Sequence, residues 1–373
     1  GNPKCIVHSA GGALIQHLKE HQLHGDIKRG DSLFYFTTCG WMMWNWLVSA
    51  LATGATIVLY EGSPFYPKAD SLWAWVEEER ITHFGTSATY LATCQKRHVR
   101  PIDTYKLTQL KTIYSTGGPL NADSFDYISE AIKEDIQVAS ISGGTDIVSC
   151  FVLGNPITPV KRGKIQCRGL GMAVESWDES GKPVYDTQGE LVCTKASPSM
   201  PIGFWNDQDG AQYQTAYFDQ YPNVWHHGDY IQIDSEGMLE MLGRSDTTLN
   251  PNGVRIGTAE IYRVIESVEE VDDSLVVGQK WKGDERIILF VISKNELDLE
   301  LKKKIRQEIK TKCSPRHVPK KIIQVSQVPY TINGKKLEKM IKKLIHGEVI
   351  TNTSVMADPT CLNEYKNREE LQA

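Results

Sequence analysis

The stretch that decides the reading of this chain covers residues 243–261 and reads Gly-Arg-Ser-Asp-Thr-Thr-Leu-Asn-Pro-Asn-Gly-Val-Arg-Ile-Gly-Thr-Ala-Glu-Ile. A largely apolar run, residues 238–242, ends at Gly243, and a polar turn containing Pro251 follows. A helix is then expected from Thr258, with Glu260 in its first turn. The stretch therefore predicts a joint between a strand-rich region and a second domain.

Two arginines, Arg244 and Arg255, flank this turn. The guanidinium group is a planar fork of donors that suits phosphates, carboxylates and ribose hydroxyls. A solvated linker with incidental charges is the alternative interpretation. This stretch alone does not decide between the two.

The length and composition limit the class of protein. A chain of 373 residues is too long for one ordinary core, so two or more domains are expected. The chain is 40% hydrophobic and 23% charged, which is typical of globular proteins. A formal net charge of -5 argues against nucleic acid as a main partner.

The eight cysteines are scattered, without C-x-x-C pairs and without histidines at metal-binding spacing. We therefore expect no zinc site. Such cysteines fit a reducing compartment, which favours the cytosol. No apolar run is long enough to span a bilayer, and no obligate protein partner is evident. Because the sequence starts without Met, we expect a fragment.

Strands and helices alternate over residues 1–150, which predicts an α/β fold with a parallel sheet. Ligands of such sheets bind beyond the carboxyl ends of the strands. Two glycine-rich turns, residues 117–119 and 142–146, fall at such ends. The expected strands cover residues 32–38, 56–60, 82–84, 112–115 and 136–140.

Short alternating strands separated by turns follow over residues 151–245. They predict a small antiparallel, barrel-like subdomain that completes a large domain spanning residues 1–245. Residues 246–347 then predict a small, mobile α+β domain. The polar tail, residues 348–373, is expected to be disordered.

The two glycine-rich turns are candidate ligand sites. In Gly117-Gly118-Pro119, the glycines would let a flat ring or a phosphate approach the backbone, although most such turns are structural. The next turn contains Thr145, a hydroxyl for a phosphate oxygen, and Asp146, a carboxylate suited to Mg²⁺. A capped turn before a helix is the alternative for this second motif.

Two later segments add polar candidates. Residues 225–229 read Trp-His-His-Gly-Asp, and a carboxylate after glycine, here Asp229, can accept both hydroxyls of a ribose. We expect the two histidines to make structural hydrogen bonds. Lys335 lies on a glycine turn, where its ammonium group could reach phosphate oxygens, although neighbouring lysines in loops are usually just solvated.

In this order, the motifs resemble the adenylate-forming superfamily of acyl-CoA synthetases over almost the whole chain. Residues 142–146, 225–229, 314–319 and 329–336 are most similar to its acetoacetate-using branch. The resemblance implies ATP-dependent ligation of acetoacetate to coenzyme A through an acyl-adenylate, with AMP and pyrophosphate as products. Acetate or another short acid is the alternative substrate, and an inactive fragment that only binds CoA or a partner is the alternative function.

The resemblance also implies roles for individual residues. Asp146 would hold Mg²⁺, Thr145 would bind the α-phosphate, and Lys335 would stabilise phosphoryl charge. Asp246 would be the hinge about which the small domain rotates. Gly117, Gly118 and Pro119 would contact the adenine, and Asp229 and Arg244 would contact the ribose. Gly253 would line the pantetheine tunnel, and Arg255 would contact the CoA or the nucleotide.

Two further positions define the acid pocket and the phosphate loop. Gly143 stands where acetyl-CoA synthetases have Trp, so the resemblance implies room for a longer acid. Lys4 would be the last residue of the family's phosphate loop, whose glycine-rich part would precede residue 1. Backbone N–H groups of that loop would cradle the ATP phosphates, so we expect this chain alone to be inactive in adenylation.

Overall fold

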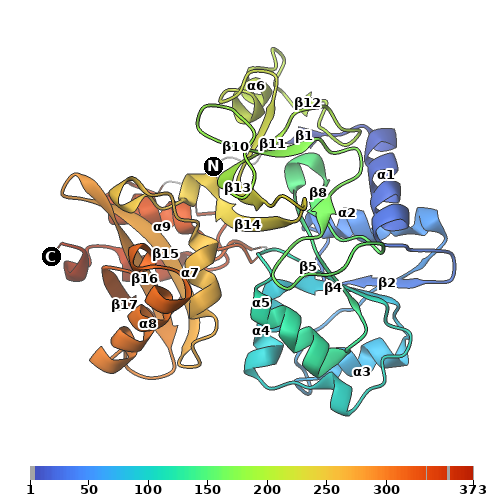
Figure 1. The fold of residues 1–373 in the computed structure, drawn as a ribbon, viewed down its shortest axis with the longest axis horizontal. Helices are drawn as coiled ribbons and strands as arrows, with labels where there is room; N and C mark the ends of the chain where they lie inside the picture. Colours follow the sequence, from blue (N-terminus) through green and yellow to red (C-terminus); the bar gives the residue numbers. More distant parts are fainter. Residues whose placement is uncertain (1–4, 333, 351–352, 373) are drawn as a thin grey trace. The chain divides into compact units, whose positions relative to one another are not determined.

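The computed structural model describes residues 5–332, 334–350 and 353–372. These residues form two compact units, one up to Met241 and one from Leu242 onward (Figure 1). Three residues that precede Met241 in the sequence, Gly228–Tyr230, also belong to the second unit. In the described part of the chain, no helix is both long and apolar enough to cross a membrane.

A five-stranded sheet forms the framework of the first unit. Its order is β3-β2-β4-β5-β6 and each neighbouring pair is parallel, which confirms the predicted parallel α/β sheet. The edge strand β3 is only partly buried. The strands span Ser32–Tyr35 (β2), Thr56–Val58 (β3), His83–Ser87 (β4), Thr112–Thr116 (β5) and Gln137–Ser140 (β6).

Helices cover both faces of this sheet, so neighbouring residues of one strand enter different cores. On β2, Phe34 packs with residues of α3, α4 and α5, whereas Leu33 and Tyr35 pack with Trp46 of α2. Figure 1 shows these two groups of helices on opposite sides of the strands. The helices span Ala10–Lys19 (α1), Met42–Ser49 (α2), Ser71–Glu78 (α3), Ala88–Lys96 (α4) and Ala122–Tyr127 (α5). Both α1 and α5 continue into a wider π-helical turn, Glu20–His24 and Ile128–Ile132.

Small antiparallel sheets complete the first unit and confirm the antiparallel character expected after residue 150. One has the order β7-β8-β9, one has the order β10-β11-β13-β14, and β1 pairs with β12. The helix α6, Ala211–Tyr217, was not expected from the sequence. The strands span Ile6–Val7 (β1), Ser142–Gly144 (β7), Ser149–Leu153 (β8), Cys167–Arg168 (β9), Val174–Trp177 (β10), Gln188–Cys193 (β11), Gly203–Phe204 (β12), Trp225–Ile233 (β13) and Leu239–Arg244 (β14).

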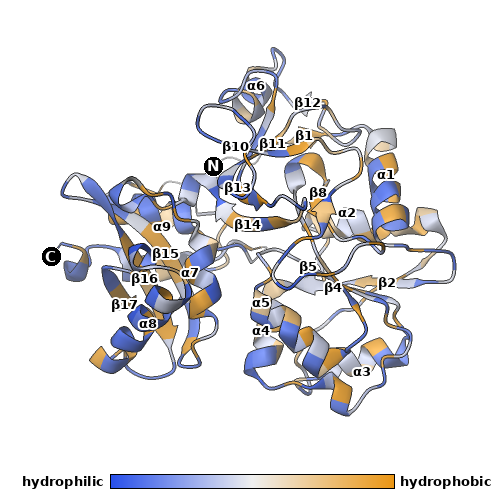
Figure 2. Ribbon diagram, viewed as in Figure 1, coloured by the Kyte–Doolittle hydropathy of each residue, from blue (hydrophilic) through white to orange (hydrophobic). Residues whose placement is uncertain are grey.

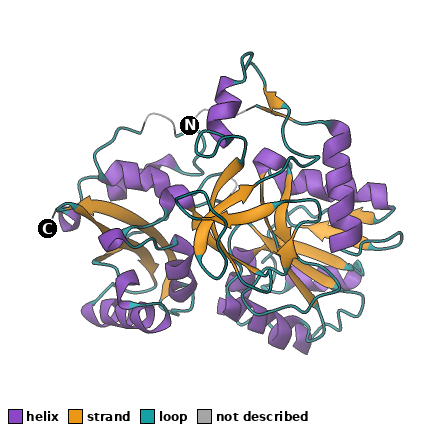
Figure 3. Ribbon diagram, turned by 45° about the horizontal axis from the view of Figure 1, so that its top comes forward, coloured by secondary structure: helices purple, strands orange, loops and turns teal. Residues whose placement is uncertain are grey.

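The second unit is a small α+β domain that begins at Leu242 and includes the tail. The strands β15 and β16 pair antiparallel, and β16 pairs with β17 in parallel through the crossover helix α8. Helices lie on both sides of these strands (Figure 3). The strands themselves are rich in hydrophobic residues (Figure 2). The elements are α7 (Thr258–Ile265), β15 (Val271–Trp281), β16 (Asp284–Ser293), α8 (Leu299–Lys312), β17 (Lys321–Gln324) and α9 (Glu338–Ile345).

The tail beyond residue 347 corrects one expectation. It was expected to be disordered, but Pro359–Tyr365 and Glu369–Leu371 form 3-10 helices. Tyr365 is fully buried and packs against Phe290 of β16, with ring centroids 4.8 Å apart. The carbonyl of Leu371 accepts hydrogen bonds from Arg286 and Gln279. A few apolar side chains in a mostly polar tail are sufficient to anchor it.

Candidate functional site

The two glycine-rich turns of the first unit lie side by side at the carboxyl ends of β5 and β6. The hydroxyl of Thr116, the last residue of β5, donates to the carbonyl of Ile141, 2.9 Å away. The chain then turns through Gly117, whose φ of +85° favours glycine. Gly117, Gly118 and Pro119 are all exposed. This edge is where ligands of parallel α/β sheets bind.

The second turn connects β7 to β8 in a tight antiparallel hairpin. Gly144 pairs with Ser149, so the hairpin loop consists of residues 145–148. Thr145 is exposed and Asp146 is partly exposed at the tip, while Ile147 is fully buried beneath it. The hairpin therefore presents a hydroxyl and a carboxylate on a buried apolar base.

The carboxylate of Asp146 is oriented by a residue that the sequence analysis missed. The hydroxyl of Tyr217, at the end of α6, donates to Oδ1 of Asp146. Burial and then the contact with Asp146 raise the pKa of Tyr217 well above its usual range, so its hydroxyl stays protonated at neutral pH. Tyr217 in turn stacks on Trp225, with ring centroids 3.8 Å apart.

Gly143 lies in β7, close to the backbone of the neighbouring strand β8. A Cβ atom at this position would lie 2.0 Å from the carbonyl oxygen of Ser149 and 2.7 Å from Cα of Cys150. Any side chain at Gly143 would therefore push against the backbone of β8. The absence of a side chain is already required by the β7–β8 hairpin, whatever acid the site accepts.

The two neighbouring histidines have separate surroundings. Nε2 of His226 lies 3.1 Å from a carboxylate oxygen of Glu190, which is the structural contact expected for it. The ring of His227 packs edge-on against Phe151 at 4.6 Å. A Cβ on Gly144 would lie 2.5 Å from the His227 ring, so this ring closes one side of the Thr145–Asp146 turn.

In the second unit, charged residues form a chain around the predicted hinge. Nη1 of Arg244 donates to Asp229 over 3.1 Å, and Nε of Arg244 lies 3.7 Å from Asp246. Asp246 also accepts from Lys339, 3.1 Å away. Gly228, with a φ of +80°, gives the guanidinium room, because a Cβ there would lie 2.8 Å from Nη2 of Arg244. Sequence reasoning placed Asp229 and Arg244 together but missed Lys339.

The joint motif itself forms a 3-10 turn, Pro251–Gly253, followed by α7. Its α7 helix begins as predicted, and the Glu260 carboxylate accepts from the N–H of Gly257. Arg255 is exposed, with its guanidinium 5.8 Å from the ring of Tyr230.

Two adjacent lysines near the C-terminus have different surroundings. The ammonium of Lys336 pairs with Asp273 at 3.0 Å and lies 4.2 Å from the ring of Tyr262. Lys335 is exposed, and its backbone N–H donates to Thr331, 3.0 Å away. Lys336 is therefore fixed by contacts within the domain, whereas the side chain of Lys335 is exposed to solvent. Lys4 lies outside the described residues.

The tail helps to hold the turn that carries Lys335. The N–H of Ile332 donates to the carbonyl of Val355 over 3.0 Å, and the N–H of Ala357 donates to the carbonyl of Tyr330 over the same distance. Residues 330–332 are therefore paired with the tail on one side. On the other side they form the turn that contains Lys335.

The described residues contain no cluster of side chains that could hold a metal ion by themselves. Over residues 5–332, 334–350 and 353–372, no group of three or more His, Cys, Asp or Glu could hold one. Mg²⁺ at nucleotide sites is usually held by one or two carboxylates together with phosphates and water. Asp146 supplies one carboxylate at the tip of the hairpin.

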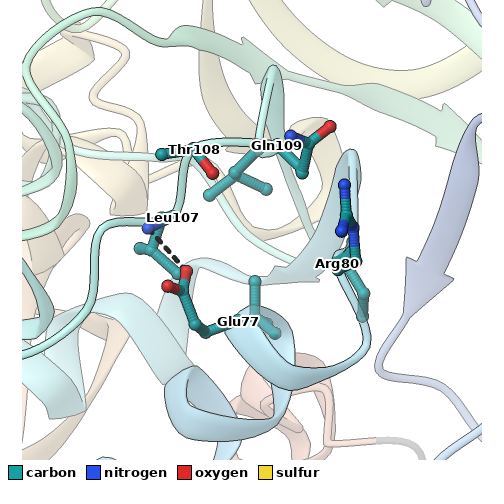
Figure 4. A pocket seen from close by; sticks show the side chains of 8 residues that line it. Glu77, Arg80, Leu107, Thr108 and Gln109 are labelled. Atoms are coloured by element: carbon teal, nitrogen blue, oxygen red, sulfur yellow. Dashed lines mark hydrogen bonds between the residues drawn. The ribbon is translucent and has the colours of Figure 1, made fainter.

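A small polar pocket lies elsewhere on the first unit and is not part of this site. It is lined by Glu77, Arg80, Thr108 and Gln109, and Glu77 accepts from the N–H of Leu107 over 2.7 Å (Figure 4). These residues precede β4 and β5. The pocket therefore lies at the amino ends of the strands, at the opposite edge of the sheet from the glycine-rich turns.

Two family models match this chain, one in each of the two units. Residues 1–204 match the family of AMP-binding enzymes, and residues 260–335 match the AMP-binding enzyme C-terminal domain. The chain belongs to the AMP-binding enzyme family.

Within that family, the chain is similar to acetoacetyl-CoA synthetases. It is 52% identical to the protein of Rhizobium meliloti over 100% of this chain and 58% of the relative, and 51% identical to that of Gallus gallus over 100% and 56%. The solved acetoacetyl-CoA synthetase from Streptomyces lividans superimposes with a TM-score of 0.92 at 44% identity, covering 98% of this chain and 57% of that one. An anthranilate CoA ligase, 19% identical, shares the fold with a TM-score of 0.78. The chain thus spans a little over half the length of its curated relatives.

Proposed function

We propose that the protein containing this chain ligates acetoacetate to coenzyme A at the expense of ATP. The acid would attack ATP to give an acyl-adenylate and pyrophosphate, and the CoA thiol would then displace AMP. The observation that carries this proposal is 52% identity to an acetoacetyl-CoA synthetase along the full length of this chain. The proposal includes ATP, Mg²⁺ and coenzyme A, and places the protein in the cytosol.

The geometry of the first unit supports the adenylation step. Thr145 and Asp146 project from a hairpin whose base is buried, and Asp146 is held by Tyr217. Such a turn can bind a phosphate oxygen and Mg²⁺ while Gly117, Gly118 and Pro119 leave space for a flat ring. We infer that catalysis comes from positioning and from stabilisation of phosphoryl charge, with no covalent enzyme intermediate.

The second unit would carry the change between the two half-reactions. Asp246, the proposed hinge, is exposed, and its pairs with Arg244 and Lys339 are exposed too. Ion pairs of this kind contribute about 0–1 kcal/mol each, so their loss would oppose a rotation only weakly. In this proposal Asp229 and Arg244 bind the ribose, Gly253 lines the pantetheine tunnel, and Arg255 contacts CoA or nucleotide.

The proposal is tested by acid-dependent exchange of pyrophosphate into ATP, comparing acetoacetate, acetate and butyrate. Exchange that is fastest with acetoacetate is the expected result for the protein. Faster exchange with acetate would contradict the substrate assignment. The chain described above is assayed in the same way, and a folded sample that is inactive with every acid would support the inactive-fragment alternative for this stretch.

The two adjacent lysines provide a matched pair of variants. Lys335→Ala should reduce the exchange rate by about a hundredfold or more and leave the melting temperature unchanged, because an exposed ammonium stabilises phosphoryl charge only during reaction. Lys336→Ala should lower the melting temperature, because this residue pairs with Asp273. The assignment fails if Lys335→Ala retains full exchange activity.

A further inference from the structure

Helix α1 and the π-helical turn that follows it place a row of polar side chains in the interior. Glu20 is 1% exposed and His17 is 3% exposed, whereas Ile15 is 62% exposed. Amphipathic helices normally bury the apolar stripe, so the orientation here is reversed. The buried members of the row are Gln16, His17, Glu20, His21 and His24.

The carboxylate of Glu20 is the centre of this row. It accepts hydrogen bonds from the Ser149 hydroxyl and, over 3.2 Å, from the N–H of Cys150. It also accepts from the Gln16 amide over 3.2 Å and from the Trp46 indole over 2.9 Å. The ammonium of Lys19 lies 3.6 Å away. Two of these four donors belong to the first two residues of β8, which is the strand that returns from the Thr145–Asp146 turn.

His17 holds the same strand one residue earlier. Its Nε2 is hydrogen-bonded to the carbonyl of Val148, the last residue of the hairpin loop. Val148 has a φ of +46° and a ψ of 34°, a left-handed conformation that is strained for a β-branched residue. Such strain persists only where the surroundings impose it, and it concentrates at functional sites. Glu20 and His17 therefore fix three consecutive residues, 148–150.

We propose that Glu20 and His17 are positioning residues for the Thr145–Asp146 turn. They hold the return strand of the hairpin in the register that directs Asp146 toward Tyr217 and presents Thr145 at the sheet edge. The inference rests on the proposed function for its catalytic consequence. Its structural content, that these two residues anchor residues 145–150, stands independently. A core with only a packing role would be satisfied by apolar side chains, since burying a carboxylate costs more than burying an apolar isostere.

The principal test is Glu20→Gln, which keeps the size of the side chain but replaces one acceptor oxygen by a donor. Backbone amide exchange with deuterium should speed up by about tenfold or more at Cys150 and across residues 145–148, with strands β4 and β5 unchanged. The matched control is Glu77→Gln on α3, which also loses a carboxylate that accepts a backbone N–H, far from the hairpin. Uniformly faster exchange throughout the unit, or an unchanged hairpin, would overturn the inference.

A second variant keeps the test decisive if Glu20→Gln does not fold. Ser149→Ala removes one anchor without changing any charge and should loosen the same residues. His17→Leu should accelerate exchange in the loop, and His17→Gln, which can still donate to Val148, should restore part of the protection. An equal effect of His17→Gln and His17→Leu would contradict the anchoring role.

The catalytic consequence has its own measurement. In ATP–pyrophosphate exchange, Glu20→Gln should lower kcat by about tenfold while the KM for acetoacetate stays the same, as expected for loss of a geometry needed in the transition state. A loosened hairpin with unchanged kcat would overturn the positioning role. If the unmodified protein uses none of the acids, the proposed function fails. The deuterium exchange alone then tests whether Glu20 and His17 anchor residues 145–150.

Discussion

At the scale of single residues, the candidate site depends on contacts between positions far apart in the sequence. Asp146 and Tyr217 are separated by 71 positions, yet the tyrosine hydroxyl donates directly to the carboxylate. A hydrogen bond to a charged acceptor contributes about 1.5–3 kcal/mol. The orientation of Asp146 is therefore set partly by α6, which carries none of the motifs found in the sequence.

Replacing Tyr217 by Phe should separate this contact from the packing of the ring. Without the hydroxyl, Asp146 loses its orienting donor, so we expect the Mg²⁺ concentration for half-maximal ATP–pyrophosphate exchange to rise by about tenfold. The matched control is Tyr213→Phe on the same helix, whose hydroxyl donates to the carbonyl of Pro201 over 2.9 Å. Equal effects of the two changes would show that the contact with Asp146 is unimportant.

Motif reasoning identified single residues where chemistry and local sequence coincide, and missed those that act from a distance. Asp146 and Lys335 stand in glycine-rich turns whose composition marks them. Tyr217, Lys339 and Glu20 stand in helices of ordinary composition, and their roles follow only from which segment packs beside them. No local pattern carries that information.

At the scale of elements, the sequence predicted types better than orientations. The helix α1 is amphipathic, but its polar face is the buried one. Periodicity indicates that two faces exist, and the usual rule then assigns the apolar face to the interior. The rule fails in α1 because the return strand β8 supplies N–H and hydroxyl donors that a carboxylate satisfies.

The tail is the second element whose structure was not predicted. It was expected to be disordered because polar residues dominate it, yet a few of its side chains fill the face of the small sheet opposite α7 and α8. The overall composition of the tail does not reveal these few buried side chains. Since residues 355–357 also pair with residues 330–332, the tail stabilises the turn that carries Lys335.

Two substitutions at Tyr365 should measure how firmly the tail is anchored. Tyr365→Ala removes a ring with no exposed surface and should lower the free energy of unfolding by about 3–5 kcal/mol. Tyr365→Phe loses only the hydrogen bond to the carbonyl of Gln327 and should cost about 1 kcal/mol. Urea titrations give both values. A disordered tail would leave both variants as stable as the unmodified protein.

At the scale of the whole molecule, buried histidines link stability to pH. Burial, and to a smaller extent the nearby His17, lowers the pKa of His21 to about 3. Burial also lowers the pKa of His8, His24 and His83. In the unfolded chain these groups would titrate near their ordinary pKa of 6.5. Below about pH 6.5, the unfolded state therefore binds protons that the folded state does not.

The consequence is a loss of stability as the pH falls. The stability that depends on neutral His21 is fully present above about pH 6.5. Between about pH 6.5 and pH 3, this part of the free energy of unfolding decreases by about 1.4 kcal/mol per pH unit. In urea titrations between pH 7 and pH 5, the free energy of unfolding of His21→Gln should change less steeply with pH than that of the unmodified protein. The exposed His98, changed to Gln, serves as the control. The same slope in all three proteins would contradict this account.

The close approach at Gly143 also has a consequence for how this position can change over evolution. Since a Cβ there would meet the backbone of Ser149, a bulky residue at Gly143 is accessible only after β8 has shifted. The anchor at Glu20 holds that backbone in place, so mutations at the two positions should be epistatic. A change at Glu20 or Ser149 that frees β8 would then act as a permissive step, whereas a substitution at Gly143 alone should lower the stability of the protein.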